Sequence, residues 1–94
     1  MEQSKYPVLH PQAASRIVDD SAVIVLADTG QVNVFNAVGT RIWDLIDGKR
    51  TPQDIARVIQ SEYDVSPETA TQDVEAFLKA LLEIKAITYQ DQPA

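Results

Sequence analysis

The change of hydrophobic period at Asn36 constrains the fold of this chain more than any other feature of its sequence. Before it, over residues 14–35, apolar residues alternate with polar ones or form a short β-branched run, which favours strands. After it, apolar residues recur three and four positions apart as far as Ile84, which favours amphipathic helices. Strands followed by helices, with no repeating strand–helix unit, indicate an α+β fold.

Three strands are expected in the first part of the chain, over residues 15–19, 22–27 and 31–35. Residues typical of tight turns separate them, so the strands form an antiparallel sheet. The middle segment is apolar throughout, which predicts a strand covered on both faces. Its side chains alternate, so Val23 and Val25 face one side of the sheet, and Ile24 and Leu26 face the other.

Three helix-start signals follow. Asn36 is a good N-cap residue, and Gly48 provides a stop for the first helix. Thr51 and Ser66 are each followed by a proline, the preferred residue of the first helical position. Helices are therefore expected after Asn36, Thr51 and Ser66. A three-stranded antiparallel sheet followed by three helices is a winged-helix-like arrangement.

The length of 94 residues allows one domain with one core. Residues 1–13 contain two prolines and no periodicity, which predicts a flexible N-terminal arm. The folded domain is expected over residues 14–89, with a short extended exit at 86–89 and a polar tail at 90–94. The start of the chain lacks the features of a signal peptide, and the longest apolar run is too short to cross a bilayer, so a cytoplasmic location without membrane contact is expected.

Residue types that carry catalysis are scarce. The chain has no cysteine, and its single histidine, His10, stands in the N-terminal arm without metal-ligand spacing around it. The three glycines form no phosphate-binding loop, and no serine or threonine has a matching His/Asp set. Gly39, inside the first expected helix, indicates close packing of that helix against a strand. We therefore expect no catalytic residue, no metal site and no cofactor.

The formal net charge of −6 disfavours nucleic acid as a partner. In a winged helix the third helix would read DNA, yet its first turns carry acidic residues and no cation before Lys79. Cationic residues gather around the first two helices, either as a modest positive patch or as ordinary surface balance: Arg41, Lys49, Arg50 and Arg57. An acidic winged-helix transcriptional regulator, or another protein-interaction module, is the alternative from another functional class.

The strand at 31–35 is expected at the edge of the sheet, where unpaired backbone groups can accept an extended peptide. One face of the sheet is covered by the helices. Because a chain of this size has little left to cover the second face, either the N-terminal arm or another molecule must do so. Self-association as a homodimer through the sheet is one such arrangement.

The run from Val34 to Thr51 resembles the signature of the PQQ-biosynthesis protein D family, a family of RiPP recognition elements. The resemblance lies in an asparagine, a glycine three residues on, an Ile-Trp pair and a closing Leu-x-Asp-Gly-x-Arg-Thr: Asn36, Gly39, Ile42, Trp43, Leu45, Asp47, Gly48, Arg50 and Thr51. Asp54-Ile55 with Glu62-Tyr63 agrees with the second helix of that family. Asp73-Val74, followed by Phe77-Leu78 and Leu81, agrees with its third. The similarity extends over about residues 15–88.

The resemblance implies a non-catalytic peptide chaperone. Members bind the leader of a ribosomally made precursor peptide and present it to a modifying enzyme, such as a radical SAM enzyme or a leader peptidase. The leader is expected to add a strand between the third strand and the third helix. Carried over by position, the binding residues are Val32, Asn33, Val34 and Phe35 on the strand, and Asp73, Phe77, Ala80 and Leu81 on the helix.

The resemblance leaves the final product open. Members that serve the quinone cofactor end this region with a Gly-Trp or similar pair, whereas residues 84–87 read Ile-Lys-Ala-Ile here. The same pattern recurs in partners of lasso-peptide proteases and of radical-based peptide-modifying enzymes. The expected role is leader binding in natural-product biosynthesis, with PQQ, a lasso peptide or another product at its end.

Overall fold

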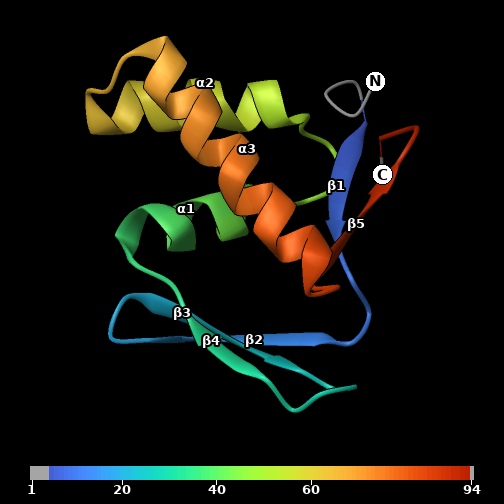
Figure 1. Cartoon of the computed structure of the whole chain (residues 1–94). Helices are drawn as coiled ribbons and strands as arrows, with labels where there is room; N and C mark the ends of the chain where they lie inside the picture. Colours follow the sequence, from blue (N-terminus) through green and yellow to red (C-terminus); the bar gives the residue numbers. More distant parts are fainter. Residues whose placement is uncertain (1–4, 94) are drawn as a thin grey trace.

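The computed structural model describes residues 5–93, which fold into two antiparallel sheets and three helices (Figure 1). The elements follow one another as β1 (Tyr6–Leu9), β2 (Ala13–Val18), β3 (Ser21–Leu26), β4 (Val32–Val34), α1 (Ala37–Leu45), α2 (Pro52–Tyr63), α3 (Pro67–Glu83) and β5 (Ile87–Gln90). The larger sheet has the order β2-β3-β4 and the smaller one pairs β1 with β5. This confirms the α+β class, the three-stranded antiparallel sheet and the three helices after it.

Tight turns hold the three-stranded sheet together. Asp19 and Asp20 both have positive φ, of 50° and 67°, as the two central residues of the hairpin between β2 and β3. Gly30, at φ 71°, makes the turn into β4, and its N–H donates to the carbonyl of Leu26 at 2.7 Å. Residues that tolerate the left-handed region therefore stand where the chain reverses, which is why these turns were readable from the sequence.

The two faces of the sheet differ in their cover. Ile24 and Leu26 are fully buried against the helices, whereas Val25 is 41% exposed on the opposite face. The alternation predicted for β3 is confirmed, but the prediction of a strand covered on both faces is wrong for the described residues 5–93. An all-apolar run of six residues does not distinguish one covered face from two.

Each helix begins at the residue that its sequence signal indicates. The Asn36 side chain accepts the Gly39 N–H at 2.8 Å and caps α1. Thr51 and Asp54 form a reciprocal capping box at the start of α2. The Ser66 hydroxyl accepts the Thr69 N–H at 3.2 Å and caps α3.

The N-terminal segment departs from the expected irregular arm. Tyr6–Leu9 forms β1 and pairs with β5 in antiparallel register, with Pro7 opposite Tyr89. The Pro7 carbonyl accepts the Gly48 N–H at 3.2 Å, and Pro7 is buried. A strand of four residues that starts beside a proline has no periodicity of its own, and its partner lies some eighty positions away in the sequence. Residues 1–4 of the expected arm and residue 94 of the expected tail lie outside the described residues.

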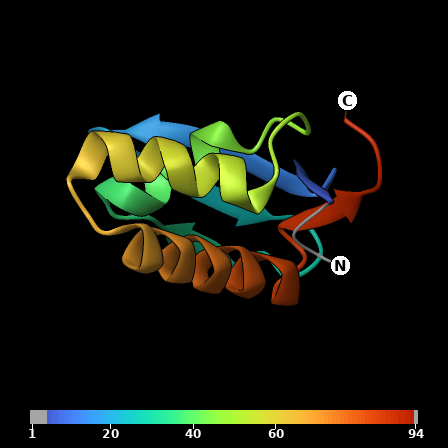
Figure 2. The same ribbon diagram turned by 90° about the horizontal axis from the view of Figure 1, so that it is seen from above.

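The core lies between the sheet and the helices. Figure 1 shows α1 between the three-stranded sheet and α2, with α3 running from the level of α2 down to the level of the sheet, and Figure 2 shows α2 and α3 side by side. The buried side chains come from β3, from all three helices and from β5, with Ile24, Ile42, Ile55 and Leu78 among the largest. In this arrangement β4 and α3 are left at one flank of the core.

Candidate functional site

The outer edge of β4 is open. β4 pairs with β3 alone among the strands of residues 5–93. Phe35 N–H donates to the Ala22 carbonyl, and Leu26 N–H donates to the Gln31 carbonyl, each at 2.9 Å. Because backbone groups alternate in direction along an antiparallel strand, the N–H and C=O groups of Val32 and Val34 point away from β3. The prediction that this strand is an edge strand is confirmed.

Side chains of the four expected strand residues point in two directions. Val32 and Val34, 59% and 68% exposed, lie on the uncovered face of the sheet. Asn33 stands opposite the buried Ile24 and therefore faces the helices. Phe35 is half-buried and packs against the core. The open edge thus combines free backbone groups, two exposed valines and an aromatic ring at its end.

The Asn33 amide is under-satisfied. Its Oδ1 accepts from Gln31 Nε2 at 3.4 Å, while its Nδ2 is buried and has no hydrogen-bond partner in the structure. A buried donor without a partner costs about 1–3 kcal/mol. Asn33 is therefore a position where β4 gives up stability.

Phe35 and Phe77 connect the end of β4 to α3. Their ring centroids lie 4.9 Å apart with the planes at 76°, an edge-to-face arrangement, and the Trp43 ring centroid lies 5.7 Å from that of Phe35. Gly39 makes room for this contact, because a Cβ there would lie 3.1 Å from Phe77 Cε1 and 3.2 Å from Phe35 Cβ. Close packing against a strand was expected at Gly39. Phe35, which directly follows β4, is indeed close, but the nearest atom belongs to Phe77 of α3, so α1 packs closely against a helix as well.

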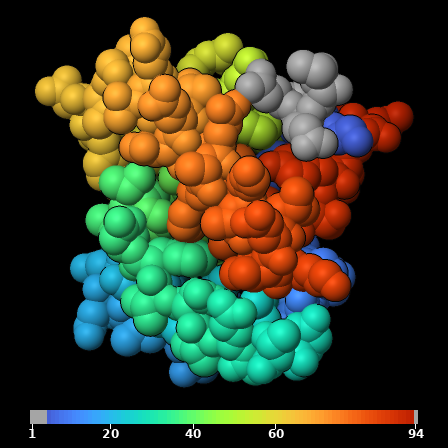
Figure 3. All heavy atoms as spheres, viewed as in Figure 1, coloured from blue at the N-terminus to red at the C-terminus, as the bar shows by residue number. Residues whose placement is uncertain are grey.

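A hollow of about 510 Å³ opens beside this ring contact, between α1 and α3. Its lining is apolar apart from Asn36 and Asp73, and consists of Asn36, Val38, Gly39, Ile42, Asp73, Ala76 and Phe77. Figure 3 shows α3, in orange, directly above the residues of β4 and the start of α1, in blue-green and green. The hollow, the ring contact and the open strand edge therefore follow one another on one flank of the molecule.

The four expected residues of α3 separate into two groups. Asp73 and Phe77 line the hollow, and Ala80 is exposed one turn further along the helix. Leu81 is 2% exposed and belongs to the core, so it offers no surface to a ligand. A helical pattern of apolar residues does not by itself separate the buried stripe from a groove next to it.

The α1 wall of the hollow was missing from the sequence-based site. Val38, Gly39 and Ile42 come from the first helix, which reaches α3 only through the tertiary packing. Gly39 was the one available signal, because a glycine inside a helix marks a close approach.

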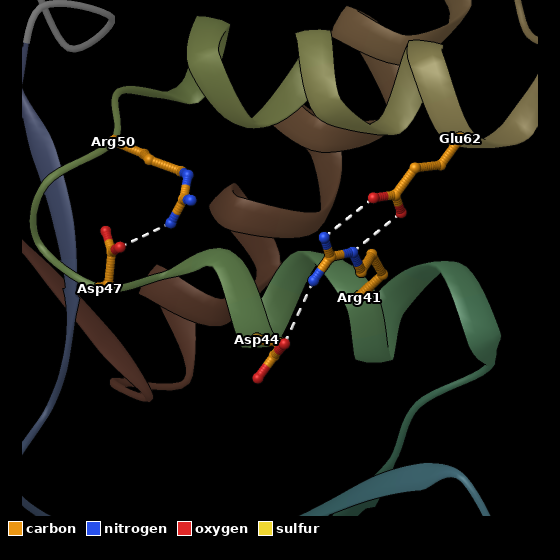
Figure 4. A network of polar contacts seen from close by, with 5 residues as sticks. All are labelled: Arg41, Asp44, Asp47, Arg50 and Glu62. Atoms are coloured by element: carbon orange, nitrogen blue, oxygen red, sulfur yellow. Dashed lines mark hydrogen bonds and ion pairs between the residues drawn. The ribbon is translucent and has the colours of Figure 1, made fainter.

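Three of the four cations near the first two helices form ion pairs. Figure 4 shows Arg41 held by Glu62 through two hydrogen bonds of 2.9 Å and by Asp44 at 3.2 Å, and Arg50 held by Asp47 at 2.6 Å. Arg57 pairs with Asp54 at 3.3 Å. The hydrogen bond to Glu62 raises the pKa of Arg41, and the Arg41 guanidinium lowers the pKa of Glu62. Of the two interpretations left open for these cations, the carboxylate partners of the three arginines favour ordinary surface balance over a phosphate-binding patch.

Residues 5–93 contain no group of three or more His, Cys, Asp or Glu side chains placed to hold a metal ion. His10 serves the turn between β1 and β2, where its Nδ1 accepts the Gln12 N–H at 3.2 Å. Among the described helices, none is long and apolar enough to cross a membrane.

Residues 21–87 match the protein-family model of "Coenzyme PQQ synthesis protein D". The search of curated proteins finds none that matches the chain.

Solved structures similar to this fold include two complexes. One is titled "TbiB1 in Complex with the TbiA(beta) Leader Peptide", with a TM-score of 0.79, 31% sequence identity, 85% of this chain covered and 93% of that chain. The second is a lasso peptide synthetase B1 complexed with the leader peptide, with a TM-score of 0.78, 26% identity and coverages of 87% and 96%. The PqqD part of PqqCD from Methylobacterium extorquens, described as a stand-alone RiPP recognition element, has a TM-score of 0.72, 19% identity and coverages of 94% and 99%.

Proposed function

Because the chain belongs to the family of coenzyme PQQ synthesis protein D, we propose that it binds the leader segment of a ribosomally synthesised precursor peptide. The leader adds a strand to the open edge of β4, next to α3, and the chain presents it to a modifying enzyme. In this role the domain, which includes β1 as well as the expected residues 14–89, binds and positions its ligand and catalyses nothing.

The open edge of β4 beside the hollow is the observation that carries this proposal. Val32 and Val34 direct two N–H and two C=O groups outward, which suits the backbone of an extended peptide. Main-chain hydrogen bonds of this kind give affinity with little sequence selection, and pockets along the edge select the side chains. The solved complexes of TbiB1 and of a lasso peptide synthetase B1 with leader peptides support the same reading.

The hollow between α1 and α3 supplies the side-chain selection. Val38, Ile42, Ala76 and Phe77 offer it an apolar lining, and Asp73 is the one charged residue of that lining. A leader with an apolar side chain for the hollow and a basic group near Asp73 fits both properties. Burial of one such apolar side chain contributes about 1.5–3 kcal/mol.

The modifying enzyme is a radical SAM enzyme or a leader peptidase in this proposal. A binding module without catalytic clusters requires such a partner, since the leader itself undergoes no chemistry on the module. The final product, whether PQQ, a lasso peptide or another compound, depends on that enzyme.

Titration of a fluorescently labelled leader tests the proposal, with the leader taken from the precursor encoded beside the gene for this chain. We expect saturable binding at micromolar concentrations. Val34→Pro removes an outward N–H without touching the ladder to β3, so affinity falls at least about tenfold, or about 1.4 kcal/mol. Val34→Thr keeps the N–H and a β-branched side chain, and its affinity stays near that of the wild type. Wild-type affinity in a folded Val34→Pro protein contradicts strand addition at β4.

Self-association through the uncovered sheet face is a second proposal for the same molecule. Val25, Val32 and Val34 form an exposed apolar strip on that face. Two copies each carrying a charge of −6 repel one another, so dimers become more abundant as salt screens the charge. Sedimentation velocity at low and high salt measures this. A monomer at all salt and protein concentrations excludes the homodimer.

A further inference from the structure

The opposite edge of the three-stranded sheet is open as well. β2 pairs with β3 alone among the strands of residues 5–93, and its Val18 stands opposite Ser21 across the two-residue turn. Residues that flank such a turn exchange hydrogen bonds, and the pattern then alternates along the strand. The backbone groups of Ser15 and Ile17 therefore point away from β3. Their side chains lie on the face that carries Ile24 and Ala22, beneath α1.

Two hollows lie along this edge. One, of about 260 Å³, is lined by Leu9, Ser15 and Arg16 from the strands and by Trp43 and Ile46 at the end of α1. Its neighbour, of about 330 Å³, is lined by Ala37, Thr40 and Arg41 from α1 and by Asp20 and Tyr63. Both include Ile17 and Asp44, so they form one groove between β2 and α1, which we call the β2–α1 groove.

Apolar side chains along this groove are exposed. Ile17 is 59% exposed, Leu9 40% and Tyr63 36%. Ile17 lies at the middle of the groove, and Leu9 and Tyr63 lie at its two ends. An extended segment of several residues could therefore contact all three. Unpaired backbone groups next to exposed apolar side chains are the two properties of a strand-accepting edge.

The charged side chains of the groove are mostly acidic, and most of them lie at its Tyr63 end. At the Tyr63 end, Arg41 is shared by Glu62 and Asp44, and Asp20 adds a further carboxylate, so acid is in excess. At the Leu9 end, Asp44 lines the groove, while Arg16, between Ser15 and Ile17 along β2, directs its side chain to the other face of the sheet. An occupant with a lysine or arginine at the Asp20 end complements this distribution.

We propose that the β2–α1 groove binds an extended segment of the modifying enzyme. The segment adds to β2, places alternate apolar side chains beneath α1 and sets a basic side chain beside Asp20. This inference rests on the proposed function, because the proposed function places the leader at β4 and so leaves the β2 edge to the enzyme. The two edges are separated by β3, about 10 Å apart, and face opposite flanks, so leader and enzyme occupy the sheet at the same time.

Amide hydrogen exchange of the full chain distinguishes the two edges. The probes are the leader peptide and the modifying enzyme encoded beside the gene for this chain, added separately and together. Leader alone protects the amides of Val32 and Val34, and enzyme alone protects those of Ser15 and Ile17. With both present, all four are protected. Failure of the leader to protect the β4 amides contradicts the proposed function, while protection at β2 by the enzyme still supports this inference.

Two matched variants of β2 separate the groove from the outer face of the same strand. Ile17→Asp places a charge in the groove, and Val18→Asp, 47% exposed in the wild type, places one on the other face. Ile17→Asp weakens enzyme binding at least about tenfold and leaves the affinity for the leader unchanged. Val18→Asp leaves both affinities unchanged. Asp20→Asn, which keeps a residue tolerant of positive φ, weakens enzyme binding several-fold and reduces its dependence on salt.

Four outcomes overturn the inference. The first is that the enzyme does not bind, with or without leader, and the second is that it protects amides elsewhere while Ser15 and Ile17 exchange freely. The third is that the leader, and not the enzyme, protects Ser15 and Ile17. The fourth is that Ile17→Asp and Val18→Asp weaken enzyme binding equally. Circular dichroism and urea unfolding of both variants establish that each is folded before its affinity is interpreted.

Discussion

The Phe35 and Phe77 rings meet edge to face at a centroid distance of 4.9 Å, and this contact joins the end of the edge strand β4 to the middle of α3. It marks one end of the proposed leader site, because the open backbone of β4 lies before it and the hollow between α1 and α3 lies beside it. The geometry of this contact depends on the absence of a side chain at Gly39.

Gly39→Val is expected to force the two rings apart. A Cβ at this position lies 3.1 Å from the Phe77 ring, and the two additional methyl groups of valine need more room still. We expect the free energy of unfolding to fall by about 1–3 kcal/mol, as for other overpacked sites. Urea unfolding measures the change. Gly39→Ala is the control, since its gain of about 1 kcal/mol in helix propensity offsets much of the strain. A Gly39→Val protein as stable as the wild type contradicts the close packing.

Ala76→Phe is expected to fill the hollow from the α3 side. Ala76 is exposed and lines the hollow, so the larger ring costs little stability while it excludes a leader side chain. We expect leader affinity to fall at least about tenfold, a loss of about 1.4 kcal/mol in binding free energy. Leu82→Phe, at an exposed position of α3 that does not line the hollow, leaves the affinity unchanged. Fluorescence titration of both variants measures this, and equal affinities for the two variants would exclude the hollow from leader binding.

Asn33→Val is expected to stabilise the protein. The buried Nδ2 has no hydrogen-bond partner, and a β-branched residue suits a strand. Removal of the amide therefore raises the free energy of unfolding by about 1 kcal/mol. Thermal and urea unfolding give the value, with Val32→Thr as a control at the neighbouring exposed position. A loss of stability in Asn33→Val shows that the amide is satisfied in the folded protein.

Asp54 is expected to make the stability of α2 depend on pH. Hydrogen bonding from the Thr51 backbone N–H, at 3.1 Å, lowers the pKa of Asp54 below its ordinary value. A lowered pKa means that the carboxylate stabilises the folded state above the pKa of the unfolded chain, near 4, and that this contribution is lost as pH falls through the folded pKa. Asp54→Asn therefore lowers stability at neutral pH by about 1 kcal/mol.

Urea unfolding of wild type and Asp54→Asn between neutral and acidic pH tests this sign. The stabilities of the two proteins should converge as the pH falls below the pKa of the unfolded carboxyl group and through the lowered pKa of folded Asp54. A difference in stability that stays constant over the whole range assigns the effect to something other than the charge of Asp54.

Much of the fold was readable from the sequence because its signals are local. The caps at Asn36, Thr51 and Ser66 act within one turn of helix, and the positive-φ residues of the hairpin act within the turn itself. The alternation of β3 placed Ile24 in the core, and the order of the elements placed β4 at an edge. Each of these conclusions depends on residues no more than a few positions apart.

What the tertiary structure alone decided involves residues far apart in the chain. The pairing of β1 with β5, the α1 wall of the hollow, the burial of Leu81 and the groove along β2 all arise when distant segments meet. The sequence by itself determined which segments are strands and helices and which strand is left at an edge. Only the packing of the helices on one sheet face decided which side chains line the spaces beside the two open edges. Burial depends on contacts between residues that are far apart in the sequence, and such contacts form only in the folded protein.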